Sequence, residues 1–147
     1  MDHLPHFPWM ETEENLTLSA LEQRVRSLAT SLNAPAIYLP TFGYSQEDGT
    51  PHIEISCTYD FVVSERGNEF ERRRTRDVDE LLFWVFQAVT FSMASEYELS
   101  HRRRGEDSRR QLFAVKVDLL KTLSPEWGQR EDENLKHILR QHPFRDR

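Results

Sequence analysis

The sequence predicts an α+β fold with an N-terminal helix, a small antiparallel sheet containing a β-hairpin, and a C-terminal bundle of about three helices packed on the sheet. Three observations lead to this prediction. The chain has 147 residues, which fits one domain of ordinary size. Apolar residues recur every three to four positions early in the chain and again after residue 77, whereas they alternate with polar residues in between. Hydrophobic residues make up 37% of the chain, enough for a core without disulfides or metal.

The first expected elements are an N-terminal arm over residues 1–16 and a helix within residues 17–34. The arm shows no periodicity, and we expect its Phe7 and Trp9 rings to dock on the domain. Leucine and valine recur at helical spacing from residue 18 to 32, and the sequence Asn-Ala-Pro that follows is a stop signal.

The sheet is expected within residues 36–74. The segment "AIYLP", residues 36–40, is short and bounded by prolines, which favours an edge strand. Apolar residues then alternate with polar ones from Ile53 to Phe61, which predicts one strand with Cys57 as a packed core thiol. A hairpin corner follows, in which Gly67 supplies the positive φ that tight turns need.

The helical part is expected within residues 77–144. Asp77 is a good N-cap for a long helix over residues 78–99 that is apolar on several sides, as a central helix is. A third helix is predicted over residues 109–123. We expect a short turn at "SPEW" that Gly128 ends, followed by a last helix over residues 131–141.

Composition and charge limit the classes of function. A single cysteine excludes an internal disulfide, and neither a secretory signal nor about 18 consecutive apolar residues occurs, so we expect a cytoplasmic protein without a membrane segment. The net charge of −6 is uneven: residues 1–63 carry two arginines against nine acids, whereas residues 101–147 carry twelve basic residues against eight acids. An acidic first half disfavours binding of a phosphate backbone there and attracts a basic partner.

A search for catalytic patterns finds none. The histidines lack metal-ligand spacing, the glycines are scattered, and no nucleophile has an evident base, so we expect no enzyme activity, no metal and no cofactor. Two arginine-rich stretches, residues 72–76 and 102–110, leave an alternative open. They are typical either of a strand paired with acids and a helix end, or of an accessory protein that binds nucleic acid.

A resemblance to a known family lies in the segments "YDFVVSERGNEFERRRTRDVDELLFWVF", "YELSHRRRGEDSRRQLF", "SPEW" and "HPF". Together they resemble the immunity protein 63 family of bacterial polymorphic-toxin and contact-dependent inhibition systems, over residues 51–144. The resemblance implies a small cytoplasmic α+β protein that binds and neutralises a cognate secreted toxin domain without catalysis. Its most particular positions, which we expect to be family scaffold, are Glu65, Arg66, Gly67, Glu69, Thr75, Asp77 and Asp107.

The surface that contacts the toxin is expected in the acidic first half. Aromatic residues beside acids are the pattern of an interface, although a plain solvated loop and strand face is the alternative. A basic toxin, such as a nuclease, would suit these acids, and no nucleic acid is expected as a direct partner. The residues predicted to contact the toxin are Phe42, Tyr44, Glu47, Asp48, Glu54 and Asp60.

Overall fold

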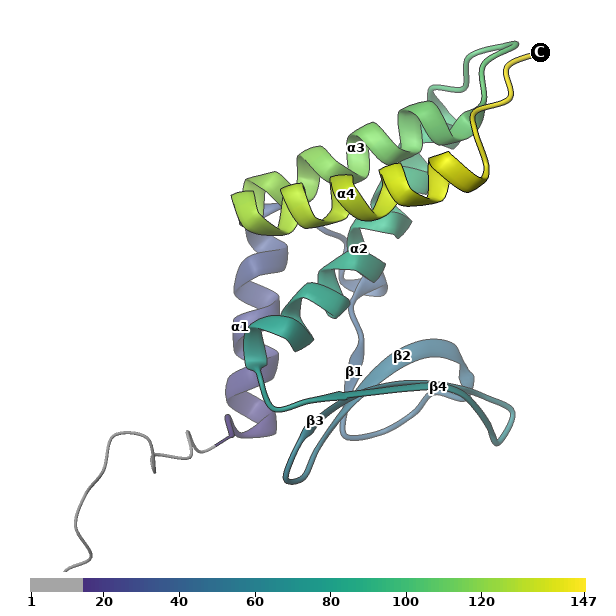
Figure 1. Ribbon diagram of the computed structural model, residues 1–147. Coiled ribbons are helices and arrows are strands. Elements are labelled where there is room, and N and C mark those ends of the chain that lie inside the picture. The colour runs from purple at the N-terminus through teal and green to yellow at the C-terminus, as the bar shows by residue number, and fades with distance from the viewer. Residues whose placement is uncertain (1–14) are drawn as a thin grey trace, which may run out of the picture.

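A four-stranded sheet lies at one end of the molecule and four helices stand on one side of it (Figure 1). The structure is a computed structural model and describes residues 15–147, so the predicted docking of Phe7 and Trp9 lies outside the described residues. The predicted α+β class is confirmed. The elements are α1 (Leu18–Ser31), η2 (Ala36–Tyr38), β1 (Thr41–Phe42), β2 (Asp48–Ile55), β3 (Tyr59–Glu65), β4 (Asn68–Thr75), α2 (Val78–Ser100), α3 (Ser108–Leu123) and α4 (Pro125–Gln141).

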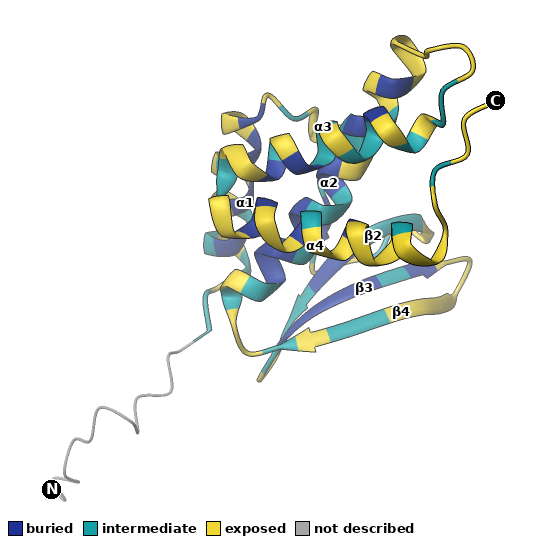
Figure 2. Ribbon diagram, turned by 45° about the horizontal axis from the view of Figure 1, so that its top comes forward, coloured by how far each residue is buried: buried dark blue, intermediate teal, exposed yellow. Residues whose placement is uncertain are grey.

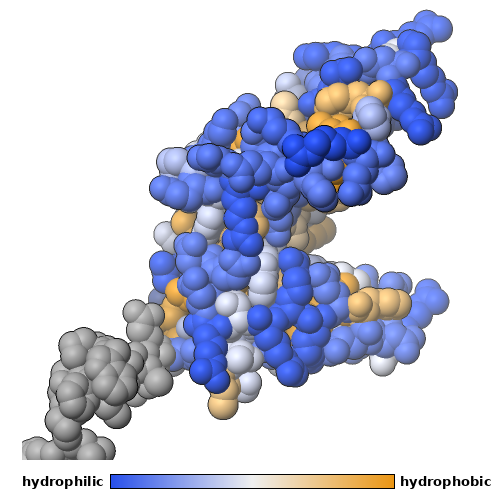
Figure 3. Space-filling view, viewed as in Figure 1, coloured by the Kyte–Doolittle hydropathy of each residue, from blue (hydrophilic) through white to orange (hydrophobic). Residues whose placement is uncertain are grey.

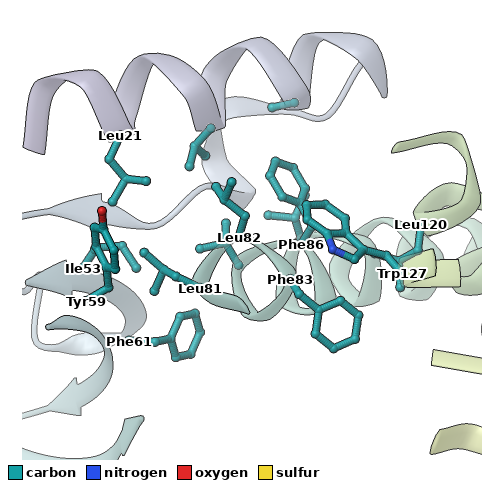
Figure 4. Close-up of a cluster of buried hydrophobic side chains, with 14 of the residues drawn as sticks. Leu21, Ile53, Tyr59, Phe61, Leu81, Leu82, Phe83, Phe86, Leu120 and Trp127 are labelled. Atoms are coloured by element: carbon teal, nitrogen blue, oxygen red, sulfur yellow. The ribbon is translucent and has the colours of Figure 1, made fainter. Parts of the chain in front are cut away.

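The core joins the sheet to α1 and α2 (Figure 4). Leu21 of α1, Phe61 of β3 and Leu81 of α2 are all at most 2% exposed. Figure 2 shows the buried stripe along α2, which is covered by the sheet, by α1 and by the pair α3 and α4. A helix that is apolar on several sides is stable only in such a central position, as the sequence predicts.

The first part of the sheet differs from the prediction. The strand expected at residues 36–40 is wrong: residues 36–38 form the single 3₁₀ turn η2, and the strand β1 follows it at Thr41. Pro40 has no N–H to donate to a strand ladder, so pairing begins only after it. β1 runs parallel to β2, with Thr41 opposite His52, whereas the other strand pairs are antiparallel in the order β1-β2-β3-β4.

The alternating stretch from residue 53 to 61 is two strands and not one. A turn at residues 56–58 separates β2 from β3, and the N–H of Ser56 donates to the carbonyl of Thr58. Ile53 comes to lie opposite Phe61, and both face the core. Cys57 lies at the tip of the turn and is exposed, so the prediction of a packed core thiol is wrong. Odd-numbered residues face the core both before and after the turn, so the alternation continues through it and resembles that of one strand.

The hairpin between β3 and β4 has the predicted corner. Arg66 and Gly67 both have positive φ, 52° and 80°, which is the requirement of a type I′ turn. Along β4, Glu71 pairs with Val63 while Glu69 pairs with Ser64, so Phe70 is the extra residue of a β-bulge.

Each of the four helices begins with a side chain that accepts a hydrogen bond from the first turn. The predicted cap at Asp77 is confirmed, since its carboxylate accepts from the N–H of Asp79. Such caps satisfy backbone donors that have no partner within the helix. The caps of the four helices in chain order are Thr17, Asp77, Asp107 and Ser124.

The last helix corrects the prediction at Gly128. α4 is one continuous helix from Pro125 to Gln141, and Gly128 is a buried residue within it. A Cβ placed on Gly128 would overlap Cγ of Lys121 and lie 3.0 Å from Cα of Lys121. The absence of a side chain at Gly128 therefore allows α3 and α4 to pack closely, and the glycine does not end a helix.

Replacing Gly128 with alanine is expected to lower the free energy of unfolding by about 1–3 kcal/mol, because overlap with the backbone of α3 outweighs the roughly 1 kcal/mol that alanine gains in helix propensity. Thermal unfolding of Gly128→Ala beside Gln129→Ala, an exposed position of the same helix, measures the difference. A Gly128→Ala protein more stable than the wild type would show that the crossing has room for a methyl group.

Candidate functional site: a partner-binding surface

A pocket of about 550 Å³ opens where α1, η2 and β1 meet the first residues of β2. We call it the α1–β1 pocket. Three of the six residues that the sequence predicts as toxin contacts line it: Phe42, Tyr44 and Asp48. The structure adds others that the sequence analysis does not select. Its further lining residues are Glu22, Arg26, Ala36, Ile37, Leu39, Pro40, Thr41, Gln46 and Thr50.

Two large side chains at this pocket are unusually open to solvent. Ile37 is 83% exposed and Tyr44 is 61% exposed, whereas Phe42 packs partly against the core. Exposed apolar and aromatic side chains grouped around a concave surface mark sites of association. The sequence prediction omits Ile37 because residues 36–40 were expected to form a strand, in which an isoleucine has no reason to be exposed. The prolines on both sides of this segment were the signal that it is not a regular strand.

The backbone around Tyr44 is held in place by specific contacts. Gly43 has a φ of 85°, its N–H donates to the carbonyl of Ile53 over 2.8 Å, and a Cβ there would lie 2.7 Å from Cδ2 of Leu18. Thr41 Oγ1 donates to the carbonyl of Tyr44. Tyr44 is thus presented by a fixed turn, which lowers the entropy cost of binding through it.

Two acids, Asp48 and Glu22, line the pocket. Hydrogen bonds from the side chain and the N–H of Thr50 lower the pKa of Asp48, and the N–H bond measures 2.9 Å. Glu22 forms an ion pair with Arg26 over 3.0 Å. The pocket therefore combines apolar side chains with one acid, Asp48, that has no ion pair among residues 15–147.

Glu47 has a different place from the one predicted for a contact residue. Its carbonyl accepts from the N–H of Arg66 and its carboxylate accepts from the N–H of Gly67 over 2.9 Å. These two bonds stabilise the turn between β3 and β4. Glu47 itself has a positive φ of 55°.

Glu54 and Asp60 lie on the outer face of the sheet, away from the helices, in a network centred on Arg72. The guanidinium of Arg72 bonds Asp60 over 2.6 Å, Glu54 over 2.7 Å and Glu69 over 2.7 Å, and Arg74 bonds Asp60 over 2.9 Å. These bonds agree with the interpretation of residues 72–76 as a strand whose arginines pair with acids.

Asp60 is not the exposed rim acid that the sequence suggests. Its side chain is only 6% exposed, because Arg72 and Arg74 cover it and Thr58 donates to it over 2.6 Å. Burial alone would raise the pKa of Asp60, but hydrogen bonds from Thr58, Arg72 and Arg74 outweigh burial and lower it. The carboxylate is ionised and holds β3 to β4.

The residues predicted as family scaffold contact the chain itself. Thr75 Oγ1 accepts from the N–H of Asp77, and Glu65 pairs with Asn68 at the closing position of the hairpin. Asp107 accepts from Arg109 and from the N–H of Arg145, which lowers the pKa of Asp107. These contacts are of the kind that builds a fold.

Most arginines of the two arginine-rich stretches are paired with acids within the described part of the chain. Arg73 contacts Glu71 over 2.8 Å, Arg102 contacts Glu98 over 3.0 Å, and Arg110 contacts Asp146 over 2.9 Å. A paired guanidinium offers less charge to a phosphate backbone, so this arrangement favours the structural interpretation of both stretches.

A second concave region lies between the inner face of the sheet and the helices, and Figure 3 shows a notch between these two parts. This cleft has a volume of about 510 Å³. Arg73 lies between two aromatic rings there, 4.8 Å from the centroid of Phe61 and 4.9 Å from that of Trp84, and Phe91 on the helix side is 51% exposed. The sequence did not predict this cleft, since it is formed mainly by residues of the sheet and of α2 that come together only in the fold.

Within residues 15–147 no group of three or more histidine, cysteine, aspartate or glutamate side chains is arranged to hold a metal ion. No helix in the same part of the chain has the length and apolar character needed to cross a membrane.

The chain is a small α+β protein in which many charged side chains pair with one another and whose α1–β1 pocket carries exposed apolar and aromatic side chains. The family model described as immunity protein 63 matches residues 56–137, more than half of the chain. The chain therefore belongs to the immunity protein 63 family, and the resemblance seen in the sequence is confirmed. Comparison with curated proteins and comparison with solved structures find no match.

Proposed function

We propose that this protein protects the cell that makes it by binding a cognate toxin domain in the cytoplasm and blocking it, without catalysing a reaction. Membership of the immunity protein 63 family is the observation that carries the proposal. The pairing of arginines with acids in the described residues supports a role in protein binding over one in nucleic-acid binding.

The toxin-binding surface in this proposal is the α1–β1 pocket. Ile37 and Tyr44 are the anchors, and Asp48 on the lining attracts a cation of the toxin. The pocket lies before residue 56, where the family match begins, so it is separate from the segment that defines the family. A surface specific to one toxin is expected outside the segment that a family shares.

The charge of the first half points to a basic toxin domain. With two arginines against nine acids, residues 1–63 would attract a positively charged surface, such as the substrate-binding surface of a nuclease. An acidic protein seated on that surface would block access of a phosphate backbone.

Co-expression with the toxin tests the proposed function. The candidate toxin is the variable C-terminal domain of a large secreted protein encoded immediately upstream. Expression of that domain should stop growth, and co-expression of this protein should restore it. Growth arrest that persists although both proteins are present and folded would contradict the immunity function.

Replacing Tyr44 or Ile37 with alanine is expected to raise the Kd for the toxin about 30-fold or more, the effect of losing an interface hot spot. Because both side chains are largely exposed, the melting temperature should change little. Calorimetric titration with an inactive toxin variant measures the Kd. Leu99→Ala is the matched control, since Leu99 is 66% exposed on α2 and does not line the pocket. Equal affinities for the wild type and all three variants would show that the toxin binds a different surface, and would not contradict the immunity function.

A further inference from the structure

The strand β4 is an open edge of the sheet. It runs for eight residues, and within the described chain its backbone pairs with β3 alone. Figure 2 shows β4 as the outermost strand, with no helix or strand drawn on its outer side. An edge of this length presents a row of unpaired N–H and C=O groups that can pair with another strand.

Natural proteins protect such edges with charged side chains, prolines or bulges. β4 has a bulge at Phe70, but its charges are divided: Glu69 and Glu71 precede Arg72, Arg73 and Arg74. An antiparallel strand of the same sequence reverses this order, so that acids come to lie against arginines. The charge pattern of β4 is therefore complementary to an antiparallel copy of the same strand.

We infer that β4 pairs antiparallel with β4 of a second copy of this chain, which joins the two four-stranded sheets into one continuous sheet around a two-fold axis. This inference goes beyond the proposed function and does not depend on the toxin.

The faces of β4 determine the register. Glu71 lies opposite Val63 and Arg73 lies opposite Phe61, so both side chains point to the inner face of the sheet. Residues directly opposite each other in an antiparallel pair share one face. Glu71 of one copy can therefore lie opposite Arg73 of the second copy, and the two-fold axis repeats this ion pair. Arg73 keeps its own Glu71 beside it at 2.8 Å, so four charges of alternating sign would form one cluster.

This register places Arg72 opposite its own copy on the outer face. Each Arg72 already has carboxylate oxygens of Glu54, Asp60 and Glu69 within 2.7 Å, so the repulsion between the two guanidinium groups is largely compensated. Phe70, the bulge residue, is 67% exposed and would come to lie near Arg74 of the second copy, whose side chain is 64% exposed. The contact would cover an apolar side chain that the single chain leaves open.

Light scattering coupled to size-exclusion chromatography, over a dilution series of the full chain, tests the inference. The wild type should approach twice the chain mass of 17.5 kDa as its concentration rises. Glu71→Arg should weaken the dimer about tenfold or more, because two opposite-charge pairs become like-charge pairs. The double variant Glu71→Arg with Arg73→Glu restores opposite charges within the chain and between copies, so it should regain the dimer.

Glu133→Arg, which makes the same change of charge at an exposed position of α4, should leave the dimer unchanged. A wild type that stays at 17.5 kDa at every concentration would overturn the inference, whatever the variants do. A dimer that survives Glu71→Arg, or a charge-swapped double variant that is folded by circular dichroism yet monomeric, would also overturn it. If the chain is monomeric and Glu71→Arg instead weakens toxin binding, the edge belongs to the toxin and not to a second copy.

Discussion

Replacing Trp127 with alanine is expected to lower the free energy of unfolding by about 3–5 kcal/mol, the largest effect among the single substitutions considered for this protein. Trp127 is 6% exposed and joins α4 to α2: its ring stacks on Phe86 with centroids 6.2 Å apart and lies at the same distance from Phe83. Its Nε1 donates to the carboxylate of Asp79 in the first turn of α2 over 3.3 Å. Alanine would leave a cavity between the two helices and remove this bond.

Chemical denaturation followed by circular dichroism measures the change, and Trp127→Phe is the matched control. Phenylalanine keeps a six-membered ring against Phe86 but loses the bond to Asp79 and the volume of the second indole ring, so its cost should be about 1–2 kcal/mol. Equal costs for alanine and phenylalanine would show that the hydrogen bond, and not the packing of the ring, holds α4 in place.

The helical part of the fold was the most predictable, and the exceptions have physical causes. Caps such as Asp77 act within a few residues, so the sequence shows them directly. Gly128 was misjudged because its role is a close approach to Lys121 of the preceding helix, a contact made in space that a local stop signal resembles. The central position of α2 was predictable because the spacing of its apolar residues indicates which sides are buried, whichever elements cover them.

Strand boundaries were less predictable because alternation does not record a change of direction. The turn at residues 56–58 keeps the polar and apolar residues in step, so Cys57 has the position of a core residue in the pattern while it lies at an exposed tip. The 3₁₀ turn η2 likewise formed where a strand was expected. The segment between the two prolines is so short that its β-propensity does not determine its secondary structure.

The candidate site was predictable where exposure follows from local sequence. Tyr44 lies in the loop after Gly43 and Asp48 begins β2, and both line the α1–β1 pocket. Asp60 was misplaced because its burial is caused by Arg72 and Arg74, twelve and fourteen residues further along the chain. The cleft beside Arg73 was not predicted at all, since its walls come from the sheet and from α2, which are separate in the sequence.

Replacing Asp60 with alanine is expected to cost about 3 kcal/mol of stability at neutral pH, the lower end of the range for breaking a buried ion pair. The lower end applies because Arg72 keeps Glu54 and Glu69 as partners. Arg74→Ala is the control: it removes one bond to the same carboxylate from a side chain that is 64% exposed, so it should cost well under 1 kcal/mol.

The same carboxylate predicts how the cost depends on pH. The pKa of Asp60 is lower in the folded protein than its ordinary value of about 3.9, so its charged form stabilises the fold above that pH. The stabilisation is lost as the pH falls through the pKa of Asp60 in the folded protein, because the carboxylate is then protonated and neutral. The difference in stability between the wild type and Asp60→Asn, measured by denaturation from pH 7 downward, should therefore stay constant to about pH 4 and shrink below it. A difference that is independent of pH would mean that shape and hydrogen bonding at Asp60, and not its charge, hold β3 to β4.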